Sequence, residues 1–184
     1  MPPPHTWIAI AFLRGDTHAQ RDRFITRVTR GPYVHTEIVL TKDDDTRSYS
    51  AFDGVGGLVP CTTRAKQGSQ WSSIRFPLPP GGYERAYALL LRILATNPPY
   101  NNQDLWQCCI KVCLPFEQDL DCSKPEEWGP RGVFCSQVAL LVLRQLARTG
   151  VIPLSQEQTD MVEATNSRGC SPNTLFSILS PPSK

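Results

Sequence analysis

The chain has 184 residues, of which 40% are hydrophobic and 20% are charged, and it carries a formal net charge of +2. This length and hydrophobic content suit one compact domain over residues 1–184. The small net charge, without a basic stripe that holds interleaved aromatic residues, argues against a nucleic-acid-binding protein. The longest apolar run is interrupted by Arg144 and Gln145, so no segment suits stable insertion into a membrane.

The N-terminal residues and the number of cysteines bear on the compartment. The first residues lack the basic start and the small-residue cleavage site of a signal peptide. This predicts a cytoplasmic protein, or one of the host cytoplasm or nucleus if the chain is viral. The seven cysteines are an odd number, and without a secretion signal a disulfide framework is not expected.

A run of cysteines, CCIKVC at residues 108–113 followed by Cys122, suggests a metal site. Zinc ligands usually come as two well-spaced pairs, however, and no histidine lies near this run. We therefore expect neither a metal nor another cofactor. A zinc-binding interaction protein is kept as an alternative.

The first half of the chain is expected to form short strands joined by tight turns. Runs of β-branched and aromatic residues, bounded by Gly, Pro and Asp, predict strands over residues 6–14, 33–40, 47–52 and 71–78, and LVPCTT at 58–63 follows a Gly-rich turn. Between the first two strands, apolar residues recur at helical spacing from Phe24 to Val28 and predict a helix that ends at Gly31. Strands so closely spaced imply an antiparallel meander.

The second half of the chain changes to helices. Apolar residues on one face predict a helix over residues 83–97, and another helix begins near Cys135 and ends at Gly150. Residues 100–131 show no clear pattern, and residues 151–184 contain one short segment, over 171–179. Residues 1–6 and 180–184 are expected to be frayed. Strands followed by helices indicate an α+β fold.

Cys135 is placed at the beginning of the predicted helix that ends at Gly150, and that position suits a nucleophile. Helix N-termini carry partial positive charge and unpaired N–H groups, which favour a thiolate over a thiol. Gly132, just upstream, would let the chain turn sharply into the helix. The alternative is that Cys135 is simply a small buried residue, because free cysteine is among the residue types most often buried.

A cysteine nucleophile needs a general base, usually a histidine, and a third polar group that orients the imidazole. Of the three histidines, His5 and His18 suit the solvated surface, whereas His35 lies within the strand YVHTEIVL. Side chains alternate along a strand, so His35 and Glu37 share one face. The alternative is an edge strand that leaves both residues in water.

Four short motifs occur in a particular order along the chain: HTEIVL at 35–40, SYSAFDGVGG at 48–57, FCSQVALLVL at 134–143 and SPNTLFSIL at 171–179. In this order they resemble the circularly permuted papain-like cysteine hydrolases, the YaeF/YiiX-like relatives of the NlpC-type peptidases, which have bacterial, phage and large-DNA-virus members. In this group the histidine strand comes first and the cysteine helix follows about 100 residues later, as His35 and Cys135 do here. The resemblance covers roughly residues 7–180.

The resemblance implies a permuted papain-like fold, an antiparallel sheet or small barrel with the nucleophile at the N-terminus of a packed helix. It makes Cys135 the nucleophile and His35 the base. Glu37 ranks first as the residue that orients the histidine, with Ser50 and Asp53 as alternatives. The helix start and a nearby imidazolium would stabilise the Cys135 thiolate, making it the most reactive thiol near neutral pH, and its backbone N–H would donate to an oxyanion.

These residues predict a thiol hydrolase that cleaves an amide, isopeptide or ester bond through a thioester. The expected substrate is a protein-linked amide, with removal of ubiquitin or a similar modifier as one specific case. A lipid amide or ester is the alternative substrate, cleaved by a hydrolase or transferred by an acyltransferase of the lecithin-retinol type. A catalytically inactive protein-binding module on the same fold is a further alternative.

Overall fold

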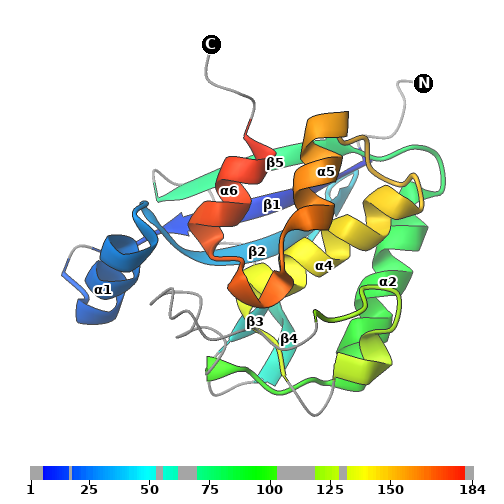
Figure 1. Cartoon of the computed structure of the whole chain (residues 1–184). Helices are drawn as coiled ribbons and strands as arrows, with labels where there is room; N and C mark the ends of the chain where they lie inside the picture. The colour runs from blue at the N-terminus through cyan, green and yellow to red at the C-terminus, as the bar shows by residue number, and fades with distance from the viewer. Residues whose placement is uncertain are drawn as a thin grey trace.

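The computed structural model describes residues 6–16, 18–52, 56–61, 70–102, 119–128 and 132–180, with only the backbone of residues 52, 56 and 57. These residues form an α+β fold in which helices pack on a five-stranded antiparallel sheet (Figure 1). The strands are β1 (Thr6–Arg14), β2 (Tyr33–Lys42), β3 (Asp45–Phe52), β4 (Gly56–Cys61) and β5 (Trp71–Pro77). The helices are α1 (Gln20–Thr29), α2 (Gly82–Thr96), α4 (Cys135–Arg148), α5 (Gln156–Ala164) and α6 (Pro172–Leu179), with 3-10 turns η2 (Pro125–Trp128) and η3 (Ser167–Gly169).

The sheet has the strand order β4-β3-β2-β1-β5, so the predicted meander holds from β1 to β3, and β4, which was not predicted, extends it. β5 returns to the far edge and pairs with β1, where Phe76 lies opposite Ile8 and Ile74 opposite Ile10. This position places the apolar residues of β5 on the same face as those of β1. β2 is the central strand and Glu37 is buried, so the alternative of an edge strand with both residues in water does not hold.

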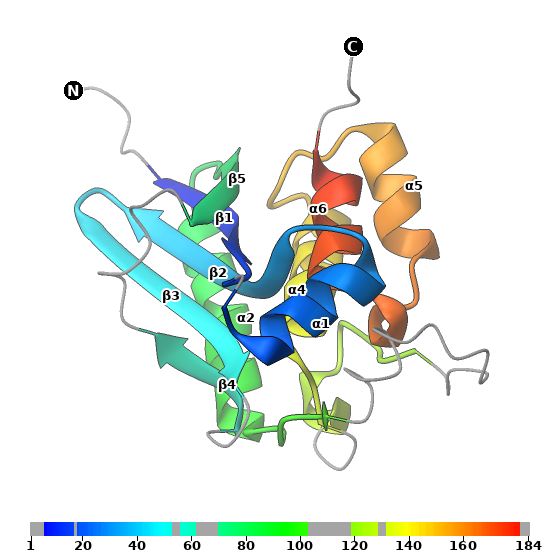
Figure 2. The same cartoon turned by 90° about the vertical axis from the view of Figure 1, so that its left-hand side faces the viewer.

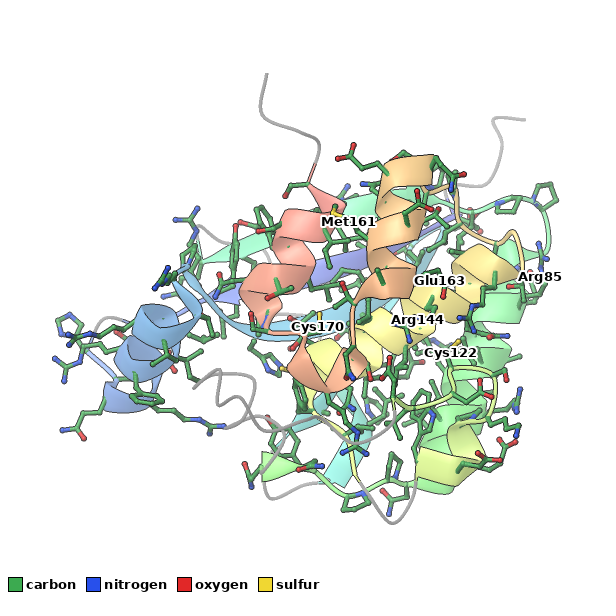
Figure 3. All side chains as sticks on the ribbon, in the orientation of Figure 1. Arg85, Cys122, Arg144, Met161, Glu163 and Cys170 are labelled. Carbon is green, nitrogen blue, oxygen red and sulfur yellow. The ribbon has the colours of Figure 1, made fainter. Side chains whose placement is uncertain are left out.

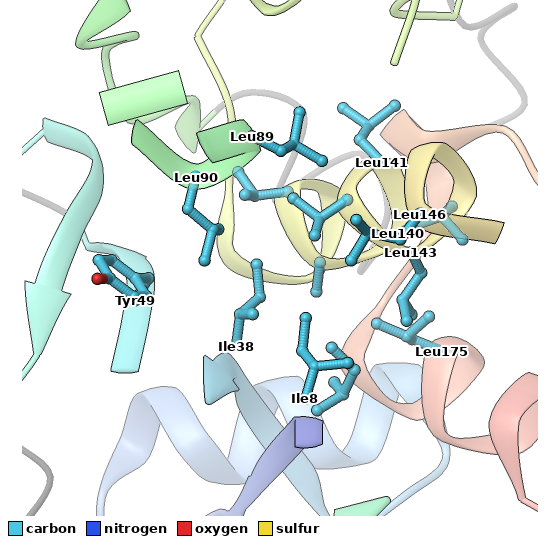
Figure 4. Packing of buried hydrophobic residues seen from close by; sticks show 14 of the residues in the cluster. Ile8, Ile38, Tyr49, Leu89, Leu90, Leu140, Leu141, Leu143, Leu146 and Leu175 are labelled. Carbon is cyan, nitrogen blue, oxygen red and sulfur yellow. The ribbon is translucent and has the colours of Figure 1, made fainter. Parts of the chain in front are cut away.

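One face of the sheet and the helix α4 form the main hydrophobic core. Ile8, Ile10, Ile38 and Leu40 are at most 1% exposed and belong to the same cluster as the leucines of α4 and α2 (Figure 4). Figure 2 shows the sheet on one side and α4, α5 and α6 on the other. α4 is therefore held in the centre of the molecule, with its first turn directed at the end of β2 and β3.

The opposite face of the sheet carries smaller side chains. Ala9, Ala11 and Val39 are buried there, and the partly buried Trp7 and Trp71 pack against them. Because side chains alternate along β2, His35 and Glu37 lie on this second face and Thr36 and Ile38 on the core face. The side chain of His35, the candidate base, thus lies on the opposite face of the sheet from Thr36 and Ile38.

The helix α5 was missed by the sequence patterns, for a physical reason. Val162 is its only buried residue, so it lacks the apolar stripe by which a helix is recognised. Its start is fixed instead by a capping box, in which the Gln158 N–H donates to Ser155 Oγ and the Ser155 N–H donates to Gln158 Oε1, each at 3.1 Å.

The ends of the chain differ from the expectation of fraying over residues 1–6 and 180–184. Thr6 pairs with Lys42 as the first residue of β1, and the Ser180 N–H donates to the carbonyl of Phe176. Residues 1–5 and 181–184 lie outside the described residues. Within the described part of the chain, none of the helices has the length and apolar character that crossing a membrane requires.

Arg144 is a buried charge on the otherwise apolar helix α4. It is 4% exposed, and its guanidinium donates to the carbonyl oxygens of Val162 and Thr165 and to Asp119 Oδ2 at 3.0 Å (Figure 3). A second carboxylate, that of Glu163, lies 3.8 Å from Nε. Arg144 therefore satisfies backbone carbonyls at the end of α5 and ties α5 to α4.

We predict that Arg144→Leu lowers the free energy of unfolding by about 3 kcal/mol or more, because it leaves buried carbonyls and a carboxylate without their donor. The matched control is Arg148→Leu, one turn along the same helix. The Arg148 side chain is 49% exposed, so its ion pair with Glu163 should contribute about 1 kcal/mol or less. Urea denaturation measures both, and equal losses for the two variants would contradict the role given to Arg144.

Candidate active site

The chain reaches Cys135 through a tightly held turn. Gly132 has a φ of 69°, and a Cβ on it would lie 2.6 Å from the carbonyl oxygen of Pro99. The Val133 N–H donates to that same oxygen at 2.8 Å, and the Val133 carbonyl accepts from Asn101 N–H at 3.0 Å. The turn thus requires glycine, as the sequence suggested, and it fixes where α4 begins.

The first turn of α4 is anchored on its inner side by side chains of its own. Ser136 Oγ donates to the carbonyl of Cys170 at 2.7 Å, and Gln137 Oε1 accepts from Phe134 N–H at 3.3 Å. The residue before the helix, Phe134, has no side-chain acceptor for the free N–H groups of the first turn. Those N–H groups are therefore directed at Cys135 and at whatever binds beside it.

Cys135 is the first residue of α4, as predicted, and its sulfur lies against the central strand of the sheet. The backbone of Thr36 and that of Ser136 lie close enough to this sulfur to lower the pKa of its thiol. Pairing between β2 and β3 ends at Ile38 and Tyr49, and the same register continued would put Ala51 opposite Thr36. The sulfur of Cys135 therefore takes the position that a β3 carbonyl would otherwise occupy.

Burial sets the protonation state of this thiol. Cys135 is 3% exposed, and burial raises the pKa of its thiol to about 11, although the backbone of Thr36 and that of Ser136 lower it. The helix start alone predicts a pKa below the ordinary value, and here desolvation outweighs it. Burial therefore opposes the thiolate that the helix start favours.

The ring of His35 is held by two polar groups at the same nitrogen. Its Nε2 lies 3.2 Å from Ser50 Oγ and 3.7 Å from Glu37 Oε1. Ser50 Oγ donates its own proton to the carbonyl of Thr36 at 2.6 Å, so toward the ring it acts as an acceptor. A proton on Nε2 satisfies this arrangement, and Nδ1 is then the nitrogen that can take a proton from a thiol.

The structure brings three of the predicted site residues, His35, Glu37 and Ser50, together, and it places Cys135 near the backbone of the residue after His35. Ser50, ranked below Glu37 in the sequence analysis, lies nearer to Nε2. Asp53 lies outside the described residues. A direct contact between His35 Nδ1 and the sulfur stays a prediction.

Sequence reasoning missed a clamp that positions the start of β2. Asn173 of α6 accepts from the Tyr33 N–H at 2.9 Å and donates to the Tyr33 carbonyl at 2.8 Å, two residues before His35. A Cβ on Gly31 would lie 2.3 Å from Asn173 Oδ1, so this clamp requires glycine at position 31. In the sequence, Gly31 was interpreted as a helix end and Asn173 lies within SPNTLF. The two positions are too far apart in the chain for a sequence pattern to connect them.

Comparisons of the chain with known protein families, with curated proteins and with solved structures found no match. Within the described ranges, no three His, Cys, Asp or Glu side chains are grouped to hold a metal ion, and Cys61, Cys122, Cys135 and Cys170 are free thiols. Residues 108–113, on which the zinc alternative rests, lie outside the described residues.

We predict that iodoacetamide modifies Cys135 slowly in the native protein at neutral pH, because its thiol is buried and has a pKa raised to about 11. The rate should rise with pH across the range in which the protein stays folded, since only the thiolate reacts. Mass mapping after brief labelling measures this, and labelling in denaturant is the control. Faster labelling of Cys135 than of the more exposed Cys61 at neutral pH would restore the stabilised thiolate.

Proposed function

We propose that this protein is a thiol hydrolase of the permuted papain-like type, which cleaves an amide, isopeptide or ester bond through a thioester. The observation that carries the proposal is the meeting of the α4 N-terminus with β2, where the Cys135 sulfur lies near the backbone of Thr36, the residue next to His35. The order of the two elements, histidine strand before cysteine helix, supports the permuted form.

In the first step, the Cys135 sulfur attacks the substrate carbonyl carbon while its proton passes to Nδ1 of His35. The carbonyl oxygen becomes an oxyanion, and the backbone N–H of Cys135, at the uncapped helix start, can donate to it. The carbon–leaving-group bond then breaks, the imidazolium protonates the leaving group, and a thioester remains. Water, deprotonated by His35, hydrolyses the thioester and regenerates the thiol.

A thiol with a raised pKa assigns a clear task to the other polar groups. The proton must move during the attack, so the imidazolium forms only as the reaction proceeds. The Glu37 carboxylate, 3.7 Å from Nε2, is placed to stabilise that positive charge, and Ser50 Oγ holds the ring in the required orientation. Both groups thus act most strongly where charge develops.

Two substrate classes are consistent with this chemistry. The first is an amide that links a protein to ubiquitin or a similar modifier. The second is a lipid ester or amide. Either substrate would acylate Cys135 in the same way.

Two active-site probes test the proposal, a ubiquitin-like protein with a C-terminal thiol trap and a lipid ester with a reactive acyl group. At least one should label the wild-type chain at Cys135, as shown by mass mapping, and neither should label Cys135→Ala. Because the thiol is buried, the lack of labelling by small alkylating agents has no bearing on this result. Labelling at another cysteine, or labelling that survives in Cys135→Ala, would end the proposal.

We predict that Ser50→Ala lowers kcat about 10- to 100-fold, because the His35 ring loses the acceptor that orients it. Ser48→Ala is the matched control, since Ser48 lies on the same strand and its Oγ donates to the carbonyl of Cys61. That variant should keep the wild-type kcat. Glu37→Gln should also reduce kcat, with little change in KM, since it removes charge but almost no volume. Wild-type rates in both Ser50→Ala and Glu37→Gln would exclude these orienting roles.

A further inference from the structure

The net charge of the chain conceals a strongly basic segment. Residues 14–30 contain two aspartates, no lysine and five arginines, at positions 14, 21, 23, 27 and 30. The rest of the chain is therefore slightly acidic. This segment ends β1 and forms α1, so the positive charge is concentrated at one end of the molecule (Figure 1).

Helical spacing gathers part of this charge on one outward face, which we name the arginine strip: Arg23, Phe24, Arg27 and Arg30. All four side chains are exposed, and Phe24 is one of two large exposed hydrophobic residues in the described part of the chain. The opposite face of α1 carries Ile25, which is buried. The strip thus combines guanidinium groups with one aromatic ring and has no carboxylate.

Within the described ranges, the arginines of the strip lack the acidic partners that other exposed basic residues have. Asp22 lies off the strip and accepts from the Asp16 N–H at 2.8 Å. Other exposed basic residues do have partners, such as Lys42 with Glu84 at 2.7 Å and Arg92 with Glu126 at 3.1 Å. Among the described residues, no carboxylate forms an ion pair with Arg23, Arg27 or Arg30.

α1 packs directly against the candidate site. Ile25 forms a buried cluster with Phe134, the residue before Cys135, and Val34, the residue before His35, packs against the same cluster. Figure 1 shows α1 projecting from the body of the protein beside the start of β2, and Figure 2 shows it in front of α4. The arginine strip is therefore carried on the outward face of the helix that packs beside the nucleophile.

We propose that the arginine strip docks the protein on an anionic phospholipid surface, and that an acyl lipid in that surface is the substrate. Guanidinium groups bind phosphate oxygens well, and an exposed aromatic ring among basic residues is typical of interfacial helices. A projecting helix suits a flat surface better than it suits an extended peptide, which needs a groove. The docking stands on the strip alone, and the choice of substrate rests on the proposed function.

The experiment is sedimentation of the full chain with vesicles of phosphatidylcholine alone or of an equimolar mixture with phosphatidylserine. The mixed vesicles should bind the protein and the neutral ones should not, and added salt should weaken the binding. Each arginine near an anionic surface strengthens binding about fivefold. Arg23→Gln combined with Arg27→Gln should therefore bind about 30-fold more weakly.

The matched control is Arg85→Gln combined with Arg92→Gln, which removes the same charge from exposed positions on α2. It should bind mixed vesicles within about twofold of wild type if charge acts locally. Equal weakening of both variants would overturn the docking site, as would equal binding to neutral vesicles or no binding at all. Strip-dependent binding to polyglutamate without binding to vesicles would overturn it in favour of an acidic protein partner.

The hydrolase proposal and the docking proposal can be overturned independently of each other. Cys135→Ala should bind mixed vesicles as the wild-type chain does, because Cys135 is buried and is not part of the strip. If vesicles bind but neither probe labels Cys135, the hydrolase proposal falls and the docking surface stands. If a ubiquitin-like probe labels Cys135 while vesicles do not bind, the docking proposal falls and the thiol hydrolase stands.

Discussion

The contact between the Cys135 sulfur and the backbone of Thr36 joins the two halves of this molecule. It forms because β2 and β3 separate beyond Ile38 and Tyr49, which leaves the backbone of Thr36 open to other partners. The sulfur of Cys135 lies near this backbone, and the Ser50 hydroxyl donates to the Thr36 carbonyl. The opening in the sheet thereby aligns the helix with the strand and brings Ser50 to the His35 ring.

Much of the fold follows from local patterns in the sequence. The strands β1, β2, β3 and β5 and the helices α1, α2 and α4 were predicted because each has a pattern of apolar residues and recognisable ends, whereas α6 was recognised only as a short segment. The helix α5 was not predicted, because it lacks an apolar stripe. A capping box and contacts to distant residues stabilise it instead. The position of β5 beside β1 was also missed, since strand order depends on which edge of the sheet offers an apolar neighbour.

The candidate site divides in the same way. Cys135 at a helix start, and His35 and Glu37 on one strand face, follow from the periods of helix and strand. The approach of Ser50 to His35 requires the β2–β3 register, which no short motif contains. The raised pKa of Cys135 could not be predicted at all, because the sequence shows the favourable helix start but not the burial that outweighs it.

The clamp made by Asn173 has a consequence for the timing of biosynthesis. The strand that carries His35 leaves the ribosome early, the cysteine helix follows about 100 residues later, and the asparagine that fixes Tyr33 comes later still. Contacts so distant in sequence form slowly, after most of the chain has collapsed. A nascent or C-terminally shortened chain would therefore hold its thiol without an aligned base. The order of assembly would itself keep Cys135 unreactive until α6 packs against the sheet.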